Sequence, residues 1–501
     1  MMSVLMKNKT WRYLIHLLLV IVYLQTNAKT RADEDVPSDT IYLQTLLEKV
    51  TNTYPPYLAA LIERDIAQGQ LRSTRGAFDF QTFARIFDNP TGFYESTTIE
   101  AGFEQFTGLW GSTLFGGYRW TDGLLPDYYA DRRTDAGGSP NIGFKLPLLK
   151  NRAIDQRRRA LQNAKLDVEL VDPVIQRQYL DFVRAATAAY LNWIKTGKVL
   201  EVAERMLSLA EDRRLAIETR IEQGLEAKSV LLENDQWVLS RKIATIDARR
   251  DFEAASIALS LFYRNDEDEP LRPLRNQLPD TWPQISKAPE DLIAPAWKHA
   301  SGHRPELRIY ELELQKLGVD KEYYRNQLLP SLDAYASASQ NLGDSLYKDT
   351  GEVELKLGIE FRVPLQRNAA KGAASANQAK IEQMQKKAVF AMEKVFAEIE
   401  KGFVSLTASG EKLELSRDNR RMAETLREIE ADRFRLGATN LLSLQIREQT
   451  AIKAEQSLLS AQYAYYLSVV DFLISSGVNF DDYQTLDSGL WDLADQWAGI
   501  R

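Results

Sequence analysis

The clearest pattern of polar and apolar positions lies in the second half of the chain. Apolar residues occupy every second position from Val353 to Val363, and charged residues or glycine lie between them. Strict alternation of this length is typical of a tilted strand that crosses a membrane with one apolar face. The pattern predicts a strand at about 352–363, paired with a second strand at about 331–340.

A second hairpin is predicted in the first half. Residues 98–120 are rich in Gly, Phe, Trp and Thr and are expected to form one strand, with a partner at about 141–148. Residues 73–98 show no regular pattern and are expected to be irregular. Two ordinary soluble hairpins would give the same pattern, but a lone hairpin is barely stable and four strands cannot enclose a pore. We therefore expect several chains to share one barrel.

Each hairpin is followed by a long helical pattern. Long helices are expected at about 149–223 and 365–436, and return helices at 225–263 and 438–475. Asp172 and Pro173 resemble an N-cap followed by a proline at the first helical position, so a break or kink is expected there. The first long helix shows apolar residues spaced mostly by three and four, as at Leu191, Ile194, Val199, Val202, Met206 and Leu209.

The two halves repeat one another. The segment from Pro147 to Ala153 returns as Pro364 to Ala370, and the segment from Arg220 to Gly224 returns as Arg433 to Gly437. Solenoid repeats have periods of roughly 20–50 residues, far shorter than this spacing, so we interpret the pattern as a duplicated subdomain. A duplicated strand-and-helix layout indicates a function based on shape and assembly.

The chain divides into five expected parts. Residues 1–28 are expected to be a signal peptide, because a basic region precedes an apolar run that is too short to span a membrane; an uncleaved anchor helix is the alternative. The first structural repeat is expected at 29–270 and the second at 301–477. An equatorial linker is expected at 271–300, and a C-terminal equatorial tail at 478–501.

Composition and charge exclude several classes of function. The 501 residues include no cysteine and carry a formal net charge of −7. The lack of cysteine excludes disulfides and thiolate metal sites, and the acidic balance argues against binding nucleic acid. Beyond the signal, no segment has the ~20 consecutive apolar residues of a spanning helix, so a mature protein that crosses a bilayer would do so as a closed barrel.

The sequence carries no recognisable enzyme motif. It lacks a phosphate-binding glycine loop, a nucleophile elbow and a zinc signature. His299 and His303 are four residues apart and could share a metal on one helix face, but no cysteine accompanies them and Pro305 follows closely. We therefore expect no enzymatic activity, no cofactor and no metal site.

Taken together, these segments resemble the TolC-like outer membrane efflux family over essentially the whole mature chain. The matching segments are the two strand-to-helix junctions at Pro147 and Pro364, residues 303–307, residues 329–332 and the two glycine turns. The resemblance implies a mainly α fold with a transmembrane β part. It also implies a homotrimer in which each protomer gives four strands to one shared 12-stranded barrel in outer membrane lipid. Long coiled helices would then form a tunnel through the periplasm.

The resemblance also implies a function. The trimer would be the exit duct of an efflux or type I secretion system in a Gram-negative bacterium. An inner-membrane pump or ABC transporter would drive transport through a periplasmic adaptor. The alternative is a periplasmic coiled-coil scaffold or adaptor without channel activity. Such a protein would lack the duplicated hairpins and would stay soluble without detergent.

The family closes its tunnel just after the two glycines, and this chain departs from the family pattern there. The family has aspartates six and nine residues after the second glycine, and a latch formed by a tyrosine and an arginine beside it. The chain has other residue types at all four positions. Arg447, Glu448 and Glu233 could form a different ion-pair gate, or they could be solvated helix faces. The gate candidates are Ser443, Ile446, Arg447, Glu448, Val230, Glu233, Phe434 and Thr439.

The turns themselves match the family better. Glycine permits the backbone angle that reverses a helix pair, and an exposed leucine beside it offers a small apolar contact. The resemblance implies that an adaptor binds here, whereas in the simpler interpretation the glycines only make the turns. The adaptor-contact candidates are Arg220, Gly224, Leu225, Arg433, Leu436, Gly437 and Ala438.

Overall fold

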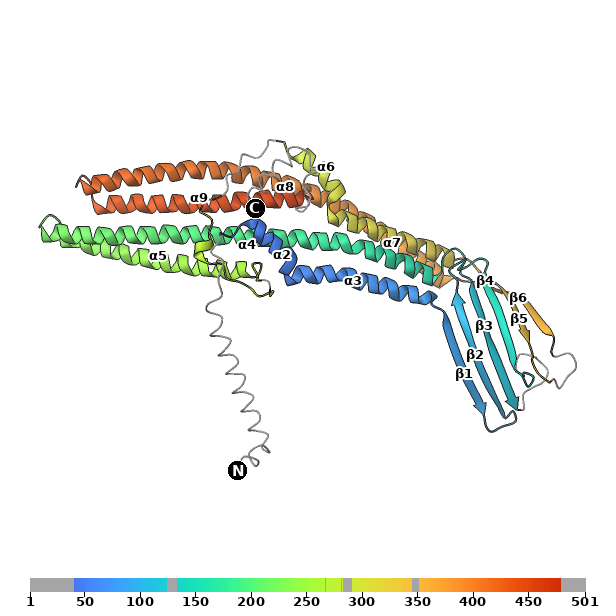
Figure 1. Cartoon of the computed structure of the whole chain (residues 1–501). Helices are drawn as coiled ribbons and strands as arrows, with labels where there is room; N and C mark the ends of the chain where they lie inside the picture. The colour runs from blue at the N-terminus through green and yellow to red at the C-terminus, as the bar shows by residue number, and fades with distance from the viewer. Residues whose placement is uncertain are drawn as a thin grey trace, which may run out of the picture.

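The chain forms a long rod of helices with a β-sheet at one end (Figure 1). The computed structural model describes residues 40–123, 133–265, 267–280, 282, 291–344 and 351–478. The expected signal peptide and all but the first residue of the expected tail lie outside these residues. None of the described helices is long and apolar enough to cross a membrane.

The sheet has six antiparallel strands whose spatial order is their order in the chain. The first four belong to the first half of the sequence and the last two to the second half. β4 pairs with β5, so the two halves meet inside one sheet. The strands are β1 (Gln81–Asn89), β2 (Ser96–Phe106), β3 (Thr113–Gly123), β4 (Ser139–Pro147), β5 (Ser331–Gln340) and β6 (Val353–Arg362).

The expected number of four strands is wrong. The segment expected to be one strand at 98–120 is divided between β2 and β3, because Gly108 and Gly111 take φ values of 70° and 71° and turn the chain. The expected irregular segment at 73–98 contains β1 and the start of β2. β1 lacks clean alternation because Phe83 and Phe87 share a face with Arg85.

The helices form two overlapping rows. Beside the sheet, the packing order is α3 (Pro55–Arg75), α4 (Gln156–Glu222), α7 (Pro305–Gln327) and α8 (Asn368–Arg435). Toward the far end, α4 pairs with α5 (Lys228–Ser260), α8 pairs with α9 (Leu441–Ser475), and α4 contacts α9. With 67 and 68 residues, α4 and α8 are each roughly 100 Å long.

Of the break or kink expected at Pro173, the break is wrong. α4 runs through this proline without interruption, and the proline is buried. Asp172 does not cap a new helix, because its carboxylate accepts a hydrogen bond from Arg64 Nε of α3 at 2.7 Å. A proline removes one helical hydrogen bond, and the flanking turns together with packing against α3 are sufficient to keep the helix continuous.

The main hydrophobic core lies at mid-height of the rod. Here the middle of α4 and α8 meets the ends of α5 and α9, together with α2 (Leu43–Thr53) and α6 (Ile293–His303). The expected linker at 271–300 contributes Leu278 and Leu292 to this core and contains the short η3 turn (Arg275–Gln277) and most of α6, which continues to His303. Trp193, Tyr466 and Phe472 are among its largest fully buried side chains.

Arg304 secures this core. Its side chain is buried, and its Nη1 atom donates to the carbonyl oxygens of Ile474 and Ser475, each at 3.2 Å, where α9 ends. Its Nη2 atom donates to Glu398 Oε2 of α8 at 2.8 Å. A cation at a helix C-terminus satisfies carbonyl groups that have no helical partner. The 303–307 segment therefore docks α9 against α8 and the α6–α7 junction.

The two histidines beside Arg304 are engaged locally. His299 Nδ1 lies 2.9 Å from the carbonyl oxygen of Ser476, and His303 Nδ1 lies 2.9 Å from that of His299. Their rings stack with centroids 4.1 Å apart. In the described part of the chain, no group of three or more His, Asp or Glu side chains is placed to hold a metal.

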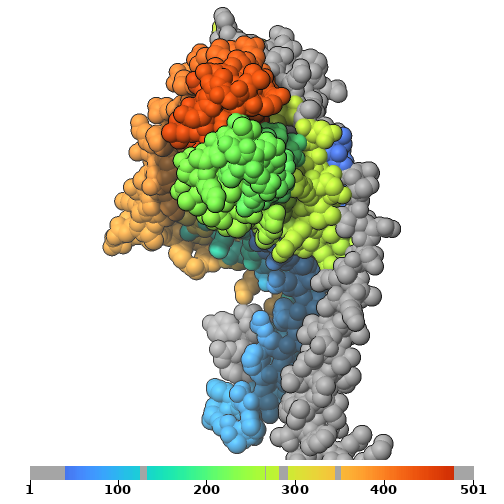
Figure 2. Space-filling view, turned by 90° about the vertical axis from the view of Figure 1, so that its left-hand side faces the viewer, coloured from blue at the N-terminus to red at the C-terminus, as the bar shows by residue number. Residues whose placement is uncertain are grey.

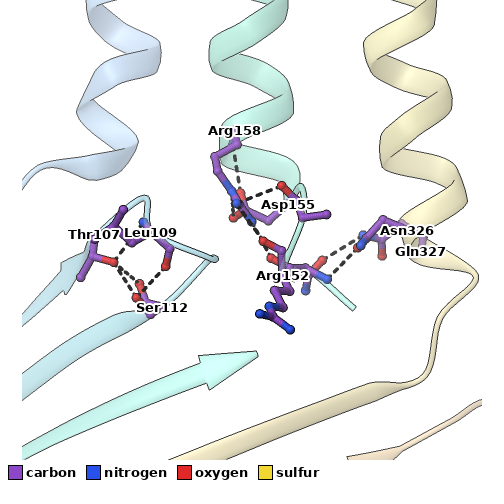
Figure 3. Close-up of polar contacts among 10 residues, drawn as sticks. Thr107, Leu109, Ser112, Arg152, Asp155, Arg158, Asn326 and Gln327 are labelled. Atoms are coloured by element: carbon purple, nitrogen blue, oxygen red, sulfur yellow. Dashed lines mark hydrogen bonds and ion pairs between the residues drawn. The ribbon is translucent and has the colours of Figure 1, made fainter. Parts of the chain in front are cut away.

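The joint between helices and sheet is a polar network. Asp155 caps α4 by accepting a hydrogen bond from the main-chain nitrogen of Arg158 at 2.9 Å. The Arg158 guanidinium then donates to the carbonyl oxygens of Asn151, Arg152 and Ala153. Figure 3 shows this network between the β2–β3 turn and the end of α7. These hydrogen bonds therefore hold the loop that connects β4 to the first residue of α4 in one conformation.

A pH-dependent contact joins α4 to α7. Asp320 accepts hydrogen bonds from Arg159 Nε at 2.6 Å and Arg159 Nη2 at 2.9 Å, and from Asn163 at 2.9 Å. Burial raises the pKa of Asp320, but these hydrogen bonds and the charge of Arg159 outweigh it and hold the pKa below its ordinary value. A lowered carboxyl pKa stabilises the fold above the unfolded pKa of about 4 and loses this contribution as pH falls through the folded value.

We predict that Asp320→Asn lowers the stability of the purified protein by about 1–2 kcal/mol at neutral pH, because Arg159 loses its charged acceptor. The difference from the wild type should shrink as pH falls below about 4, where the wild-type carboxylate becomes protonated. Thermal unfolding at pH 7 and at pH 3 measures this difference in stability between the variant and the wild type. Equal differences at both pH values would contradict the ion pair.

Candidate functional site

The two turns at the far end of the rod have the same main-chain geometry. Gly224 and Gly437 have φ values of 71° and 74°. Each glycine nitrogen donates to a carbonyl three residues back, and the next residue donates five residues back, from Leu225 to Arg220 and from Ala438 to Arg433. This pair of bonds defines a Schellman motif, which satisfies the last carbonyls of α4 and α8. The adaptor-contact candidates of each turn therefore lie together at one tip.

The tips expose apolar side chains. Leu225 is 66% exposed and Leu436 is 83% exposed. Figure 2 views this end of the rod and shows the α4/α5 tip next to the α8/α9 tip. Leu232, Leu442 and Ile446 are also exposed within the first turns of the return helices. The two tips together therefore present a broken apolar surface at the end of the molecule.

Polar side-chain contacts within each helix pair also hold the two turns. Arg220 pairs with Glu226 at 3.5 Å in the first turn. In the second turn, Thr439 Oγ1 donates to Glu430 Oε1 at 2.5 Å, and Arg433 Nη1 lies 3.4 Å from Glu430 Oε2. Thr439 and Phe434, which stand at the family's latch positions, thus belong to a compact turn in which Thr439 is bonded within its own helix pair. Sequence reasoning missed Glu430.

Glu448 joins the two helix pairs near these tips. Its carboxylate is buried and forms an ion pair with Arg213 of α4, whose Nη1 lies 3.3 Å from Oε2. Trp237 Nε1 of α5 donates to the same oxygen at 3.3 Å. The other two members of the predicted ion-pair gate, Arg447 and Glu233, are exposed and do not join this contact. Glu448 is therefore not part of a solvated helix face.

A second contact extends the link. Arg241 of α5 donates from Nη2 to Gln449 Oε1 of α9 at 2.6 Å, and its guanidinium lies over the Trp237 ring at 4.1 Å from the centroid. Burial lowers the pKa of Arg241, although Glu448 opposes the shift. We name Arg213, Trp237, Arg241, Glu448 and Gln449 the inter-pair cluster. In the described part of the chain, its polar contacts are the ones between the two helix pairs that lie nearest the tips.

The remaining gate candidates on the return helices lie between this cluster and the tips. Val230 and Ser443 are half-buried near the starts of α5 and α9, and Ile446 is 56% exposed. Of the cluster, sequence analysis found only Glu448 and missed Arg213, Trp237, Arg241 and Gln449. The only sequence signal was the four-residue spacing of Trp237 and Arg241, which places both on one face of α5.

The sheet at the other end has two different faces. The apolar face carries charges only at Asp88 and Asp122, next to the outer loops. In the strand register, its larger side chains are Ile86, Ile99, Phe103, Leu114, Tyr118, Trp120, Ile142, Phe144, Leu146, Leu332, Val353, Leu355, Leu357, Ile359 and Phe361. The charged face carries Arg85, Glu100, Glu104, Arg119, Lys145, Asp333, Glu354, Lys356, Glu360 and Arg362.

We predict that Gly437→Ala destabilises its turn by about 1–2 kcal/mol, because a side chain disfavours the left-handed conformation even where there is open space. Amide hydrogen exchange of peptides spanning residues 433–441 should become about 5–30-fold faster. Gly372→Ala is the matched control. This glycine is also unobstructed but lies inside α8, where alanine stabilises. Unchanged exchange in Gly437→Ala would contradict the motif.

We predict that Glu448→Ala lowers stability by about 3–5 kcal/mol, because it leaves Arg213 buried without a counter-ion. The control Glu428→Ala removes an exposed carboxylate and should cost at most about 1 kcal/mol. Replacing both charges, as in Arg213→Met with Glu448→Met, should recover much of the loss. Thermal unfolding measures all three variants, and equal effects of Glu448→Ala and Glu428→Ala would refute the buried pair.

The comparisons with known proteins support the fold. No protein-family model matches the sequence, and curated proteins give no significant match. Among solved structures, the CmeC outer membrane channel of Campylobacter jejuni is 12% identical, with 92% of this chain and 90% of that chain covered and a TM-score of 0.63. The open-state MtrE outer membrane channel of Neisseria gonorrhoeae is 16% identical, with 89% and 91% covered and a TM-score of 0.63.

The outer membrane protein VceC of Vibrio cholerae is 14% identical, with 87% of this chain and 96% of that chain covered and a TM-score of 0.62. In all three comparisons the match extends over nearly the full length of both proteins. The chain therefore has the fold of these outer membrane channel proteins, the TolC-like fold that its sequence resemblance predicts.

Proposed function

We propose that the protein is a trimeric outer membrane channel that acts as the exit duct for efflux or type I secretion. The observation that carries this proposal is the apolar face of the sheet at the end of a helical rod roughly 100 Å long. Such a rod can cross the periplasm while the sheet lies in the membrane. The similarity to outer membrane channels supports the same arrangement.

The apolar face suits contact with lipid. On β6, the side chains of Val353, Leu355, Leu357, Ile359 and Phe361 are each 62–74% exposed. An apolar surface of this extent is unusual on a soluble monomer and marks a membrane or protein contact. The alternative, a periplasmic coiled-coil scaffold, gives no reason for a two-faced sheet. Outer membrane lipid is therefore the proposed surrounding of this face.

The charged face suits a water-filled lumen. Acidic and basic side chains alternate across neighbouring strands, as at Glu100 opposite Arg119 and at Lys145, which pairs with Asp333 at 3.1 Å. Charges of both signs are costly in lipid but are readily solvated in a channel. When three such sheets close into one wall, they enclose an aqueous pore that continues into the helical tunnel.

The tips are the proposed site of adaptor binding. Arg220 and Arg433 lie at equivalent places on two turns of the same main-chain geometry, and an exposed leucine lies next to each glycine, Leu225 after Gly224 and Leu436 before Gly437. A periplasmic adaptor with a helical end could therefore bind both tips of each protomer in the same way. In this proposal an inner-membrane pump or ABC transporter supplies the energy.

The inter-pair cluster is the proposed gate contact. Opening the periplasmic end requires the α8/α9 tip to move away from the α4/α5 tip, and the buried ion pair of Arg213 and Glu448 opposes this movement. An adaptor that binds the separated tips more tightly than the closed tips would shift the equilibrium toward the open channel. The channel itself remains passive.

We predict that the purified protein forms small, flickering currents in a planar lipid bilayer and that Glu448→Ala increases the open fraction and the current. The exposed substitution Glu428→Ala should leave both unchanged. Size measurement in detergent should give a trimer. A monomer that stays soluble without detergent and never conducts would refute the channel and favour the coiled-coil scaffold. A trimer that conducts equally in all three proteins would refute only the gate contact.

A further inference from the structure

The two edges of the sheet are open. Every residue of β1 is exposed, and on β6 every residue except Glu360 is exposed. An edge strand carries unpaired main-chain donors and acceptors, and these cannot remain unsatisfied in lipid. β1 leads away from the helices and β6 leads back to them, so β1 of one protomer can pair with β6 of the next as an antiparallel partner.

Aromatic rings cover glycines across the sheet on directly opposite positions. An added Cβ atom at Gly102 would lie 2.8 Å from the Phe83 ring, and one at Gly143 would lie 2.3 Å from the Phe115 ring. Such pairs help to fix strand register. Gly358 of β6 is different, because an added Cβ atom there would meet nothing within 4 Å. It is an uncovered glycine on the charged face at an open edge.

β1 offers an unused ring to this glycine. Phe87 lies on the same charged face and is 55% exposed, whereas Phe83 already covers Gly102. We propose that β1 pairs with β6 of a neighbouring protomer, with Phe87 opposite Gly358, and that all six strands enter the wall. This pairing rests on the trimer of the proposed function. Three protomers with six strands each then close an 18-stranded barrel, whereas the family resemblance implies a 12-stranded barrel.

Charges favour this register. It places Arg85 opposite Glu360, and on the apolar face it places Ile86 opposite Ile359. Moving β1 by two residues in one direction would put Arg85 opposite Arg362. Moving it in the other direction would put Arg85 against Gly358 and leave the glycine uncovered. Opposite charges directly across a strand pair stabilise it, and like charges destabilise it.

The stagger of the strands agrees with barrel closure. Direct partners across one protomer run through Phe83, Gly102, Gly117, Asn141, Ser339 and Glu354. In the proposed register, the next position is residue 91 of the neighbour, eight residues beyond Phe83. The displacement is eight residues of ~3.3 Å along the strand, and the distance across the sheet is six strand spacings of ~4.8 Å. Their ratio gives a strand tilt of about 42° from the barrel axis, inside the usual range of 35–45°. Shifts of two residues give about 35° or about 49° by the same calculation.

The helices below have a matching width. At this tilt, six strands occupy about 39 Å of the circumference, and four strands would occupy about 26 Å. The row of α3, α4, α7 and α8 occupies about 32–40 Å at the usual spacing of helix axes. β1 continues from α3 and β6 continues into α8, so the outer helices of the row lie directly under the outer strands.

The β1–β2 hairpin is also fixed to the joint below it. Gln105 of β2 donates to the carbonyl oxygen of Phe78 at 2.7 Å, at the end of α3. The β2–β3 turn is closed by Thr107 and Ser112, whose hydroxyl oxygens are 2.6 Å apart, as Figure 3 shows. An added Cβ atom at Gly111 would lie 2.4 Å from the carbonyl oxygen of Asn151, so this turn packs against the start of α4.

The absence of cysteine allows a direct test. Directly opposite residues of antiparallel strands have the spacing that a disulfide needs. The variant Ile86→Cys with Ile359→Cys leaves Phe87, Gly358 and both charges intact. Oxidation in outer membrane vesicles should give covalent dimers and trimers on a non-reducing gel. Matched controls for a shifted register join Ile359→Cys with Ala84→Cys or with Asp88→Cys.

A second set tests the four-stranded alternative, in which β3 is the edge. It joins Ile359→Cys with Gly116→Cys or with Tyr118→Cys. Cross-linking only through residue 86 supports the six-stranded closure. Cross-linking through β3, through a shifted position or at no position overturns it. Conductance of the unoxidised proteins is recorded in parallel, so that a conducting trimer without the expected cross-link refutes the barrel proposal alone, and a non-conducting monomer refutes the proposed function as well.

Discussion

The antiparallel pairing of β4 with β5 is the interaction on which the rest of the architecture depends. It brings two segments nearly 200 residues apart in sequence into one sheet, with Asn141 opposite Ser339 and Pro147 opposite Asp333. Lys145 and Asp333 reinforce the pairing across the charged face. Because α4 follows β4 and α7 precedes β5, the pairing also sets these two helices side by side, where Arg159 and Asp320 hold them.

The duplication is preserved in the helices and changed in the sheet. α4 and α8 have nearly equal lengths, and both end in the same glycine-centred turn. The first repeat carries four strands and the second carries two. An additional hairpin can enter an antiparallel meander without disturbing either neighbour, because an even number of strands returns the chain to the same end of the sheet. The helical part has no comparable freedom, since both long helices must reach the same depth.

Much of this fold could be predicted from periodicity. β6 was evident because its apolar side chains all lie on one face, whereas β1 was missed because Phe83 and Phe87 lie on the charged face with Arg85. The turns were predictable because the left-handed conformation favours glycine. The inter-pair cluster was not predictable from the sequence, because the pairing of Arg213 with Glu448 spans 235 residues and depends on how α4 and α9 are packed. The break expected at Pro173 does not occur, because the packing of α4 against α3 outweighs the local tendency of proline to interrupt a helix.

The turns at the tips are closed by their own main chain. An added Cβ atom at Gly224 or Gly437 would meet no described atom within 4 Å, and the same two main-chain bonds close the reversal at each glycine. The exposed side chains beside each glycine, such as Leu225 and Leu436, therefore have little part in folding. These side chains can change in evolution while the backbone of each turn stays the same. A duplicated gene could therefore acquire a new binding partner and still encode a chain that folds.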